Sequence, residues 1–250
     1  MIRFCFLLYL LIHILGDYYF QGEKLAEQKI YRLSKVFQHN LIYLVIALII
    51  SVPFFTLDML ISVVVLAVLH AVIDLIKYWV LKKKDHKDTA DQTAGTSYLV
   101  DQALHLLCIL IVACVVVGMN ADIRPLLKLR ILFDNTGIDF YGIMKWLVLL
   151  LLIFKPANIT IKHLLDAYKP KNDREAEGHK NAGAFIGSLE RLIILILLSL
   201  GQFAAIGLVL TAKSIARYNK IAEDKVFAEY YLLGTLLSTV FVLGAFLIVR

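Results

Sequence analysis

The sequence predicts an all-α, polytopic membrane protein built as a helical bundle of about seven transmembrane helices. Hydrophobic residues make up 60% of the 250 residues, and the mean hydropathy is +0.76, whereas a soluble domain is usually about 45–50% apolar. The apolar residues also gather in runs of roughly the 20 residues that a helix needs to cross the hydrocarbon core. Because a backbone in lipid must satisfy its own hydrogen bonds, we expect these runs to be helices.

Seven such runs follow one another along the chain, separated by polar connections. They cover residues 4–20, 40–57, 58–81, 98–119, 138–160, 187–212 and 230–249. The first resembles a signal peptide, but no small-x-small cleavage pattern follows it, so we expect a retained helix. The runs define three regions: a four-helix membrane unit over 1–119, a polar connection over 120–137, and a C-terminal membrane unit of about three helices over 138–250.

The distribution of basic residues predicts an orientation in the membrane. The odd-numbered connections together carry 13 Lys and Arg, and the even-numbered ones carry seven. The positive-inside rule then places the N-terminus outside and the odd connections in the cytoplasm. The basic sixth connection conflicts with this pattern. Either the number of spans is wrong in the second half, or that segment lies on the membrane surface as an amphipathic helix.

Histidine and aspartate stand four residues apart at three places within the apolar runs. The pairs are His13 with Asp17, His70 with Asp74, and Asp101 with His105. A spacing of four places both side chains on one face of a helix. Ionisable groups are costly inside a membrane, so each pair indicates a site rather than chance.

The alternating direction of the first four spans brings these pairs to one membrane face. The first span ends with its pair, the second begins just after His39, the third carries its pair near its end, and the fourth carries its pair in its first two turns. We therefore expect a single cluster, toward the cytoplasmic face in the predicted orientation.

The residue types in this cluster suit a divalent metal. Imidazole nitrogen and carboxylate oxygen together favour zinc, manganese or ferrous iron. The candidate ligands for one or two ions are His13, Asp17, His70, Asp74, Asp101 and His105, with His39 as a further ligand or a general base. An open coordination position would lower the pKa of bound water toward about 7, for attack on an ester or phosphoester. Lys77 and the run Lys82–Lys84 would hold an anionic head group, while Gln21 and Gln102 would orient the ligands or the substrate.

A second polar set lies in the last third of the chain. Glu190 and Arg191 stand near the start of the sixth span, and Lys213 and Arg217 at its end. The two C-terminal cations could clamp a lipid phosphate, could snorkel to the membrane surface, or could pair with Glu190.

The motifs resemble an uncharacterised family of bacterial multi-pass membrane proteins. They are His13-Ile-Leu-Gly-Asp17-x3-Gln21, His39, His70-x3-Asp74 and Asp101-Gln102-x2-His105, over residues 1–119. Later segments are similar to the C-terminal part of longer members. The resemblance implies membership and a location in the bacterial inner membrane, but carries no activity. A weaker similarity, of pattern only, is to membrane-bound metal-dependent hydrolases.

The leading hypothesis is a hydrolase with a divalent metal, acting on a lipid-like or phosphorylated substrate. A metal or proton transporter is the first alternative, because buried His and Asp relays also serve transport. A non-catalytic membrane partner or sensor, whose polar cluster fixes its packing, is the second. Membrane lipid is the expected partner. Nucleic acid is not, because the chain has no basic, aromatic-interleaved soluble domain.

Overall fold

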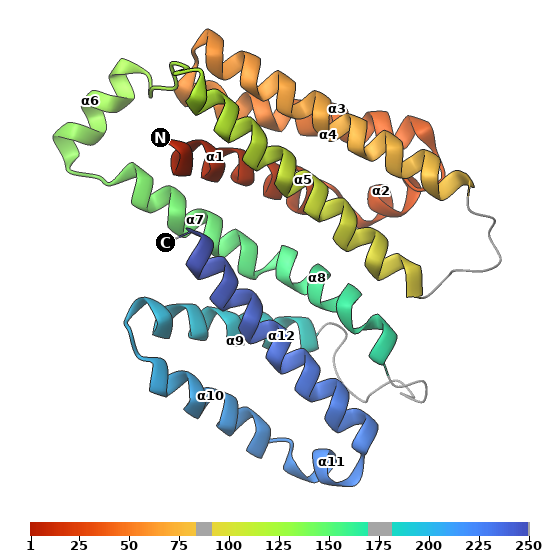
Figure 1. Ribbon diagram of the computed structural model, residues 1–250. Helices are drawn as coiled ribbons and strands as arrows, with labels where there is room; N and C mark the ends of the chain where they lie inside the picture. Colours follow the sequence, from red (N-terminus) through yellow and green to blue (C-terminus); the bar gives the residue numbers. More distant parts are fainter. Residues whose placement is uncertain (84–91, 170–181, 250) are drawn as a thin grey trace. The chain divides into compact units, whose positions relative to one another are not determined.

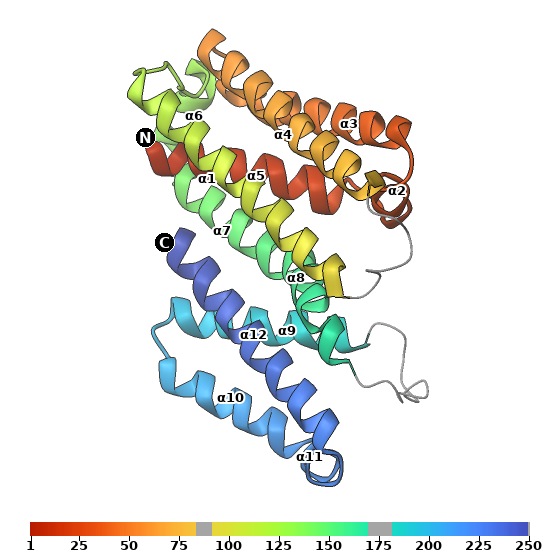
Figure 2. The same ribbon diagram turned by 45° about the vertical axis from the view of Figure 1, so that its right-hand side comes forward.

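The computed structural model describes residues 1–83, 92–169 and 182–249, which form helices joined by turns. It confirms the predicted all-α polytopic bundle. Six segments of the described residues, not seven, are long and apolar enough to cross a membrane. The chain divides into two compact units, Met1–Val148 and Leu149–Arg250 (Figures 1 and 2).

The N-terminal unit is built on a bundle of four long helices. Its helices are α1 (Ile2–Ile14), a π-helical turn (Leu15–Tyr19), α2 (Glu23–Gln28), α3 (Leu33–Ser51), a short 3-10 turn (Val52–Phe54), α4 (Leu57–Lys83), α5 (Gln92–Gly118), α6 (Leu127–Thr136) and α7 (Phe140–Ile153). The unit boundary falls within α7. The helices α1, α3, α4 and α5 alternate in direction, as the sequence predicted (Figures 1 and 2).

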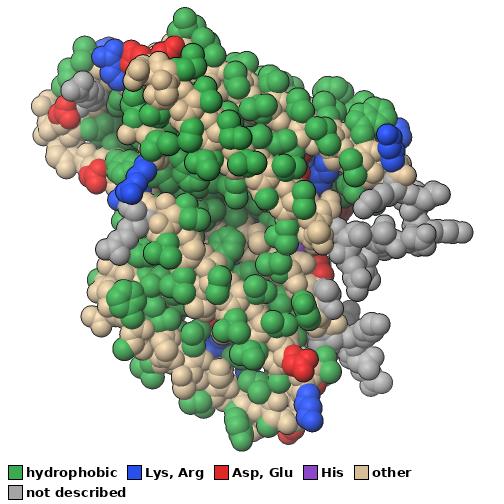
Figure 3. Space-filling view, in the orientation of Figure 1, with side chains coloured by type: hydrophobic (Ala, Val, Ile, Leu, Met, Phe, Trp, Pro, Cys, Tyr) green, Lys and Arg blue, Asp and Glu red, His purple; other side chains and the backbone are tan. Residues whose placement is uncertain are grey.

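Helix α1 forms the core of this bundle. Every residue from Leu7 to Ile14 is buried, and the helix packs against α3 and α5, which also pack against α4. The outer faces of α4 and α5 instead leave many Val, Leu and Ile side chains exposed. Figure 3 shows hydrophobic side chains across much of the visible surface. Such extended apolar surface is typical of helices that face lipid.

The C-terminal unit contains shorter helices packed on one long helix. They are α8 (Lys155–Leu165), a 3-10 turn (Asp166–Tyr168), α9 (Ala182–Ser199), α10 (Phe203–Ile215), α11 (Tyr218–Glu223) and α12 (Lys225–Val249). Helix α12 packs against α8 and α9, and α9 packs against α10.

The predicted single span over 187–212 is wrong, because the chain turns back between α9 and α10. Gly201 adopts φ +70° there, in the left-handed region that glycine enters without a steric penalty. Glu190 and Lys213, at nearly equal distances from the turn along the chain, form an ion pair. The two helices therefore make an antiparallel hairpin. An unbroken apolar run conceals such a turn, since hydropathy does not report backbone direction.

Two further boundaries differ from the predictions. The second span begins at Leu33 rather than after His39, because the first two turns are amphipathic and bury Val36 and His39 on one face. The fifth span is interrupted at Phe154, two residues before Pro156, whose ring cannot continue a helical hydrogen-bond ladder.

Candidate metal site

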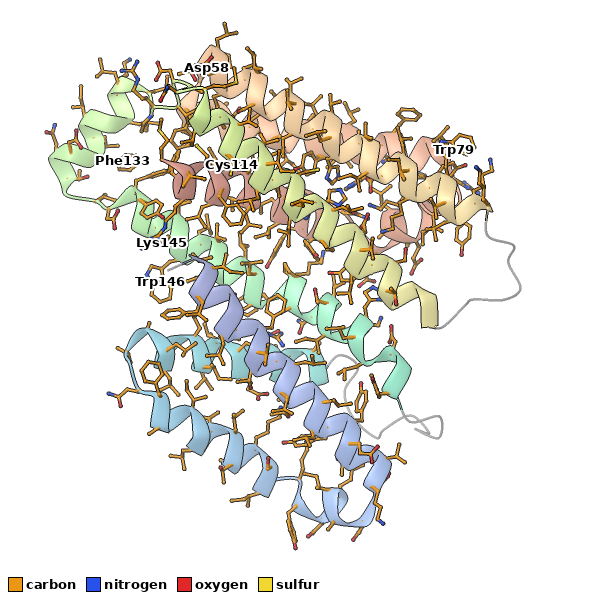
Figure 4. The ribbon with its side chains drawn as sticks, viewed as in Figure 1. Asp58, Trp79, Cys114, Phe133, Lys145 and Trp146 are labelled. Atoms are coloured by element: carbon orange, nitrogen blue, oxygen red, sulfur yellow. The ribbon has the colours of Figure 1, made fainter. Side chains whose placement is uncertain are left out.

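Histidine and aspartate side chains from four helices meet inside the N-terminal unit. His70 and Asp74 lie in the second half of α4 (Leu57–Lys83), toward the end that carries Trp79 and away from Asp58, which are both labelled in Figure 4. The structure brings together all seven residues that the sequence singled out, and their side chains are buried. They are His13, Asp17, His39, His70, Asp74, Asp101 and His105.

The π-helical turn after α1 directs Asp17 into the cluster. Its backbone bond runs from the Phe20 amide to the Leu15 carbonyl, 2.8 Å away and five residues back. Such π-turns are frequent at functional sites. The Asp17 Oδ1 atom lies 3.3 Å from the Nε2 atoms of both His39 and His70, but its Oδ2 atom is 3.9 Å from His13 Nδ1. The closest partners of Asp17 are therefore on other helices and not its own sequence pair.

Asp74 joins the same four-residue centre. Its Oδ2 atom lies 3.4 Å from His39 Nε2 and 3.7 Å from His70 Nε2, and the two Nε2 atoms are 3.1 Å apart. The Nε2 atoms of His39 and His70, from α3 and α4, are thus flanked by carboxylate oxygens of Asp17 on the π-turn and Asp74 on α4.

A second group lies beside this centre and shares Asp74 with it. The ligand atoms of Asp74, Asp101 and His105 all lie within 4.8 Å of one another, as do those of His13, Asp17 and His70. Gln102 supports this side of the cluster. Its Oε1 atom lies 3.1 Å from His13 Nε2 and accepts a hydrogen bond from the Tyr18 hydroxyl at 2.7 Å.

Two ammonium groups neutralise part of the carboxylate charge. Lys29 Nζ lies 3.2 Å from Asp74 Oδ1, and Lys77 Nζ donates to Asp101 Oδ2 at 2.8 Å. Burial lowers the pKa of Lys29, but the carboxylates of Asp74, Asp17 and Asp101 outweigh it, so the pKa stands above its ordinary value. Lys29 therefore stays charged at neutral pH. It also reaches Gln21 Oε1 at 3.5 Å.

The sequence analysis missed Lys29 and Tyr43. Lys29 stands outside every apolar run, where no helical spacing connects it with the pairs. Tyr43 stacks on His70 with ring centroids 3.8 Å apart and 12° between the planes, and it also contacts Gly16. The glycine next to Asp17 was the only available signal of that close approach. A cavity of about 10 Å³ lined by His13, His70 and His105 is about the size of one water molecule.

The second polar set lies in the C-terminal unit and is largely paired there. Lys213 contacts Glu190 Oε2 at 2.5 Å and Thr235 Oγ1 at 3.1 Å. The Arg191 guanidinium is buried and donates to the Ile153 carbonyl at 2.6 Å. Arg217 lies over the ring of Tyr231.

Near the C-terminal end of α4, Lys82 lies over the rings of Tyr78 and Trp79. Lys84, the last residue of the predicted basic run, is outside the described residues.

Comparison with known proteins identifies the N-terminal half. A family model described as a protein of unknown function, DUF3307, matches residues 5–133. No curated protein and no solved structure matches the chain. The matched region covers just over half of the chain and includes every His and Asp of the cluster, so the protein belongs to the DUF3307 family.

Proposed function

We propose that the N-terminal unit binds a divalent cation through Asp17, His39, His70 and Asp74, and uses it to hydrolyse a lipid-like or phosphorylated substrate. The observation that carries this proposal is the spacing of the four ligand atoms. The His39 and His70 Nε2 atoms lie 3.1 Å apart, and each lies 3.3–3.7 Å from an oxygen of Asp17 and of Asp74. Two ligands that are each 2.0–2.1 Å from a zinc ion are about 3.3–3.4 Å apart at neighbouring corners of a tetrahedron, so these separations suit ligands of one ion.

The donor chemistry agrees with this geometry. Two imidazoles and two carboxylates form a nitrogen–oxygen set that zinc, manganese and ferrous iron all accept. The carboxylates offset the charge of a dication, which reduces the cost of burying it. His39 has no exposed surface and faces three of the other ligand atoms, so we assign it as a ligand rather than as a mobile general base.

A divalent cation that kept one coordination position for water would supply Lewis-acid activation of that water at neutral pH. In the hydrolysis, the water oxygen forms the new bond to the carbonyl carbon or phosphorus. The ester oxygen leaves with its bonding electrons, and the proton taken from water passes to that leaving oxygen. Asp74 and Asp17 would balance the cation charge throughout, and Gln102 would keep the His13 ring oriented.

A substrate would reach the site from the C-terminal end of α4, which carries the lysines. The cavity beside the histidines has room for a water or an ion but not for a substrate. The Lys77 side chain is 24% exposed, and Asp101, its partner, is buried. Lys77 would thus extend from the cluster toward the membrane surface and hold an anionic head group there.

A transporter has less support from the same helices. Toward the Asp58 end of the bundle, the described side chains that join α1 to α4 through hydrogen bonds are Tyr9 and Ser62, 2.8 Å apart. An uncharged pair of this kind does not provide the relay of ionisable groups that proton or metal transport uses.

The α9–α10 hairpin supports an orientation with the cluster toward the cytoplasm. Because α9 and α10 run antiparallel, the connections that precede α9 and follow α10 lie on one membrane side. Both are basic, so the conflict raised by the sixth connection disappears. With six crossings, the N-terminus lies outside a bacterial inner membrane, and the basic connections after α1, α4, α8 and α10 lie in the cytoplasm.

Metal analysis of the purified protein tests the proposal. We expect zinc or manganese to remain bound to the wild type after loading and dialysis, and to be lost from His39→Ala and His70→Ala. His163→Ala, at a half-buried histidine in α8, is the matched control and should retain the metal. Release of phosphate or fatty acid from phospholipid and lipid-phosphate vesicles would then identify the reaction. A folded wild type that binds no metal would refute the proposal.

A further inference from the structure

We propose that the N-terminal unit holds a second divalent cation on Asp74, Asp101 and His105, and that this ion enters together with a phosphate-type anion. The inference rests on the proposed function, because it takes the first ion as bound beside it. It narrows the substrate class to phosphoesters. Its support comes from His105, from Asp101 and from the charge of the whole cluster.

His105 has the hydrogen bonding of a metal ligand. Its Nδ1 atom lies 2.8 Å from the backbone carbonyl oxygen of Asp101. A carbonyl can only accept, so the ring proton is on Nδ1 and the lone pair is on Nε2. Within the described part of the chain, that buried Nε2 atom has no hydrogen-bond partner. Histidines that bind metals usually donate their other ring N–H to a carbonyl or carboxylate in this way.

Asp101, four residues before His105, also carries a buried oxygen without a partner among the described residues. Its Oδ2 atom accepts from Lys77 at 2.8 Å and lies 3.4 Å from Gln102 Nε2. Its Oδ1 atom is buried and has no hydrogen-bond partner among the described residues. An unpaired carboxylate oxygen is costly to bury, and a cation shared with His105 would satisfy both orphaned atoms.

Asp74 connects this position to the first one. It belongs both to the group with His39 and His70 and to the group with Asp101 and His105. In two-metal phosphoester hydrolysis, the two cations clamp the attacking and leaving oxygens, and Asp74 would hold the two ions as neighbours. The shared residue therefore supports a two-ion site, whereas the charge of the cluster selects the phosphoester.

Charge indicates when the second ion binds. The three carboxylates of Asp17, Asp74 and Asp101 lie near two ammonium groups, on Lys29 and Lys77, and these five groups together carry one net negative charge. One dication would change this net charge from −1 to +1, and a second dication would change it to +3. Because unpaired buried charge is costly, a phosphate group of about −1.5 to −2 would have to accompany the second ion.

Manganese stoichiometry, measured with and without inorganic phosphate, tests this inference. After dialysis, we expect one manganese ion per wild-type chain in sulfate buffer and two in phosphate buffer of equal ionic strength. His105→Ala and His105→Gln should bind one ion in both buffers, whereas the His163→Ala control should behave as the wild type. Spin coupling between two neighbouring manganese ions should appear in the electron paramagnetic resonance spectrum only with phosphate.

The outcomes separate this inference from the proposed function. One ion in both buffers for the wild type would overturn the second site and leave the first intact. Two ions without phosphate, or two ions in a folded His105 variant, would also overturn it. No ion in any wild-type sample would refute the proposed function itself.

Discussion

The Nε2 atoms of His39 on α3 and His70 on α4 face each other at 3.1 Å, and both lie 3.3 Å from one oxygen of Asp17. Two imidazole nitrogens this close repel each other unless a proton or a cation lies between them. Three separate backbone segments supply this contact, so it depends on the packing of the bundle. The packing of this contact, of two other buried polar groups and of the α9–α10 hairpin can each be tested.

Enlarging Gly16 should disturb the site through Tyr43. A Cβ atom at Gly16 would lie 2.5 Å from a ring carbon of Tyr43, and Tyr43 stacks on His70. We expect Gly16→Ala to destabilise the protein by about 1–3 kcal/mol, as overpacking does, and to weaken metal binding. Thermal unfolding in detergent and metal titration would measure both effects. Gly22→Ala, where a Cβ meets open space, is the control; equal behaviour of the two variants would contradict the prediction.

Lys29 should make the protein sensitive to alkali. Its pKa is raised above the ordinary value of 10.5, so the folded protein holds this proton more tightly than the unfolded chain. The stabilisation is complete below the unfolded pKa and is lost as pH rises through the folded pKa. We expect the melting temperature of the metal-free wild type to fall as the pH rises above the ordinary lysine pKa of 10.5.

Lys29→Met should remove this part of the alkaline decline and should lower stability at neutral pH. Lys35→Met is the matched control, because Lys35 bonds Gln38 at the surface. If the wild type and Lys29→Met lost stability in parallel with increasing pH, Lys29 would not be the titrating group.

Arg191 should stabilise the C-terminal unit without affecting metal binding. It donates to the Ile153 carbonyl and contacts Asn158 and Ser238 at 2.5 and 3.2 Å. Arg191→Met would leave several buried polar groups unpaired, at about 1–3 kcal/mol each. We expect a lower melting temperature but an unchanged metal content in the fraction that remains folded. Loss of metal from folded Arg191→Met would show that the site depends on the second unit.

The α9–α10 hairpin should place Lys169 and Asn219 on one side of the membrane. Single cysteines at these positions, in a variant whose Cys5, Cys108 and Cys114 are replaced by serine, should react with a membrane-impermeant maleimide from the same side. A cysteine at Ile2 should react from the opposite side. Labelling of Lys169→Cys and Asn219→Cys from opposite sides would show that the hairpin segment crosses the membrane once.

The sequence by itself determined the all-α architecture and the helix faces that carry ionisable groups. Apolar runs of membrane length specify helices because the backbone has no other way to satisfy its hydrogen bonds in lipid. Spacing of four then fixes which side chains share a face. Because successive spans run in opposite directions, their order alone was sufficient to predict that the first four carry their polar residues toward one end.

Only the tertiary structure decided which of those groups meet. Asp17 is closer to His39 and His70 than to His13, because a π-turn rotates it away from its sequence partner and helical spacing assumes a regular α-helix. Lys29 reaches Asp74 from a connection, where no periodicity specifies direction. The turn at Gly201 divides an unbroken apolar run, and hydropathy could not predict it because hydropathy does not depend on backbone direction. Hydropathy predicts which residues of one helix are buried, whereas contacts between helices depend on the turns that join them and on how they pack.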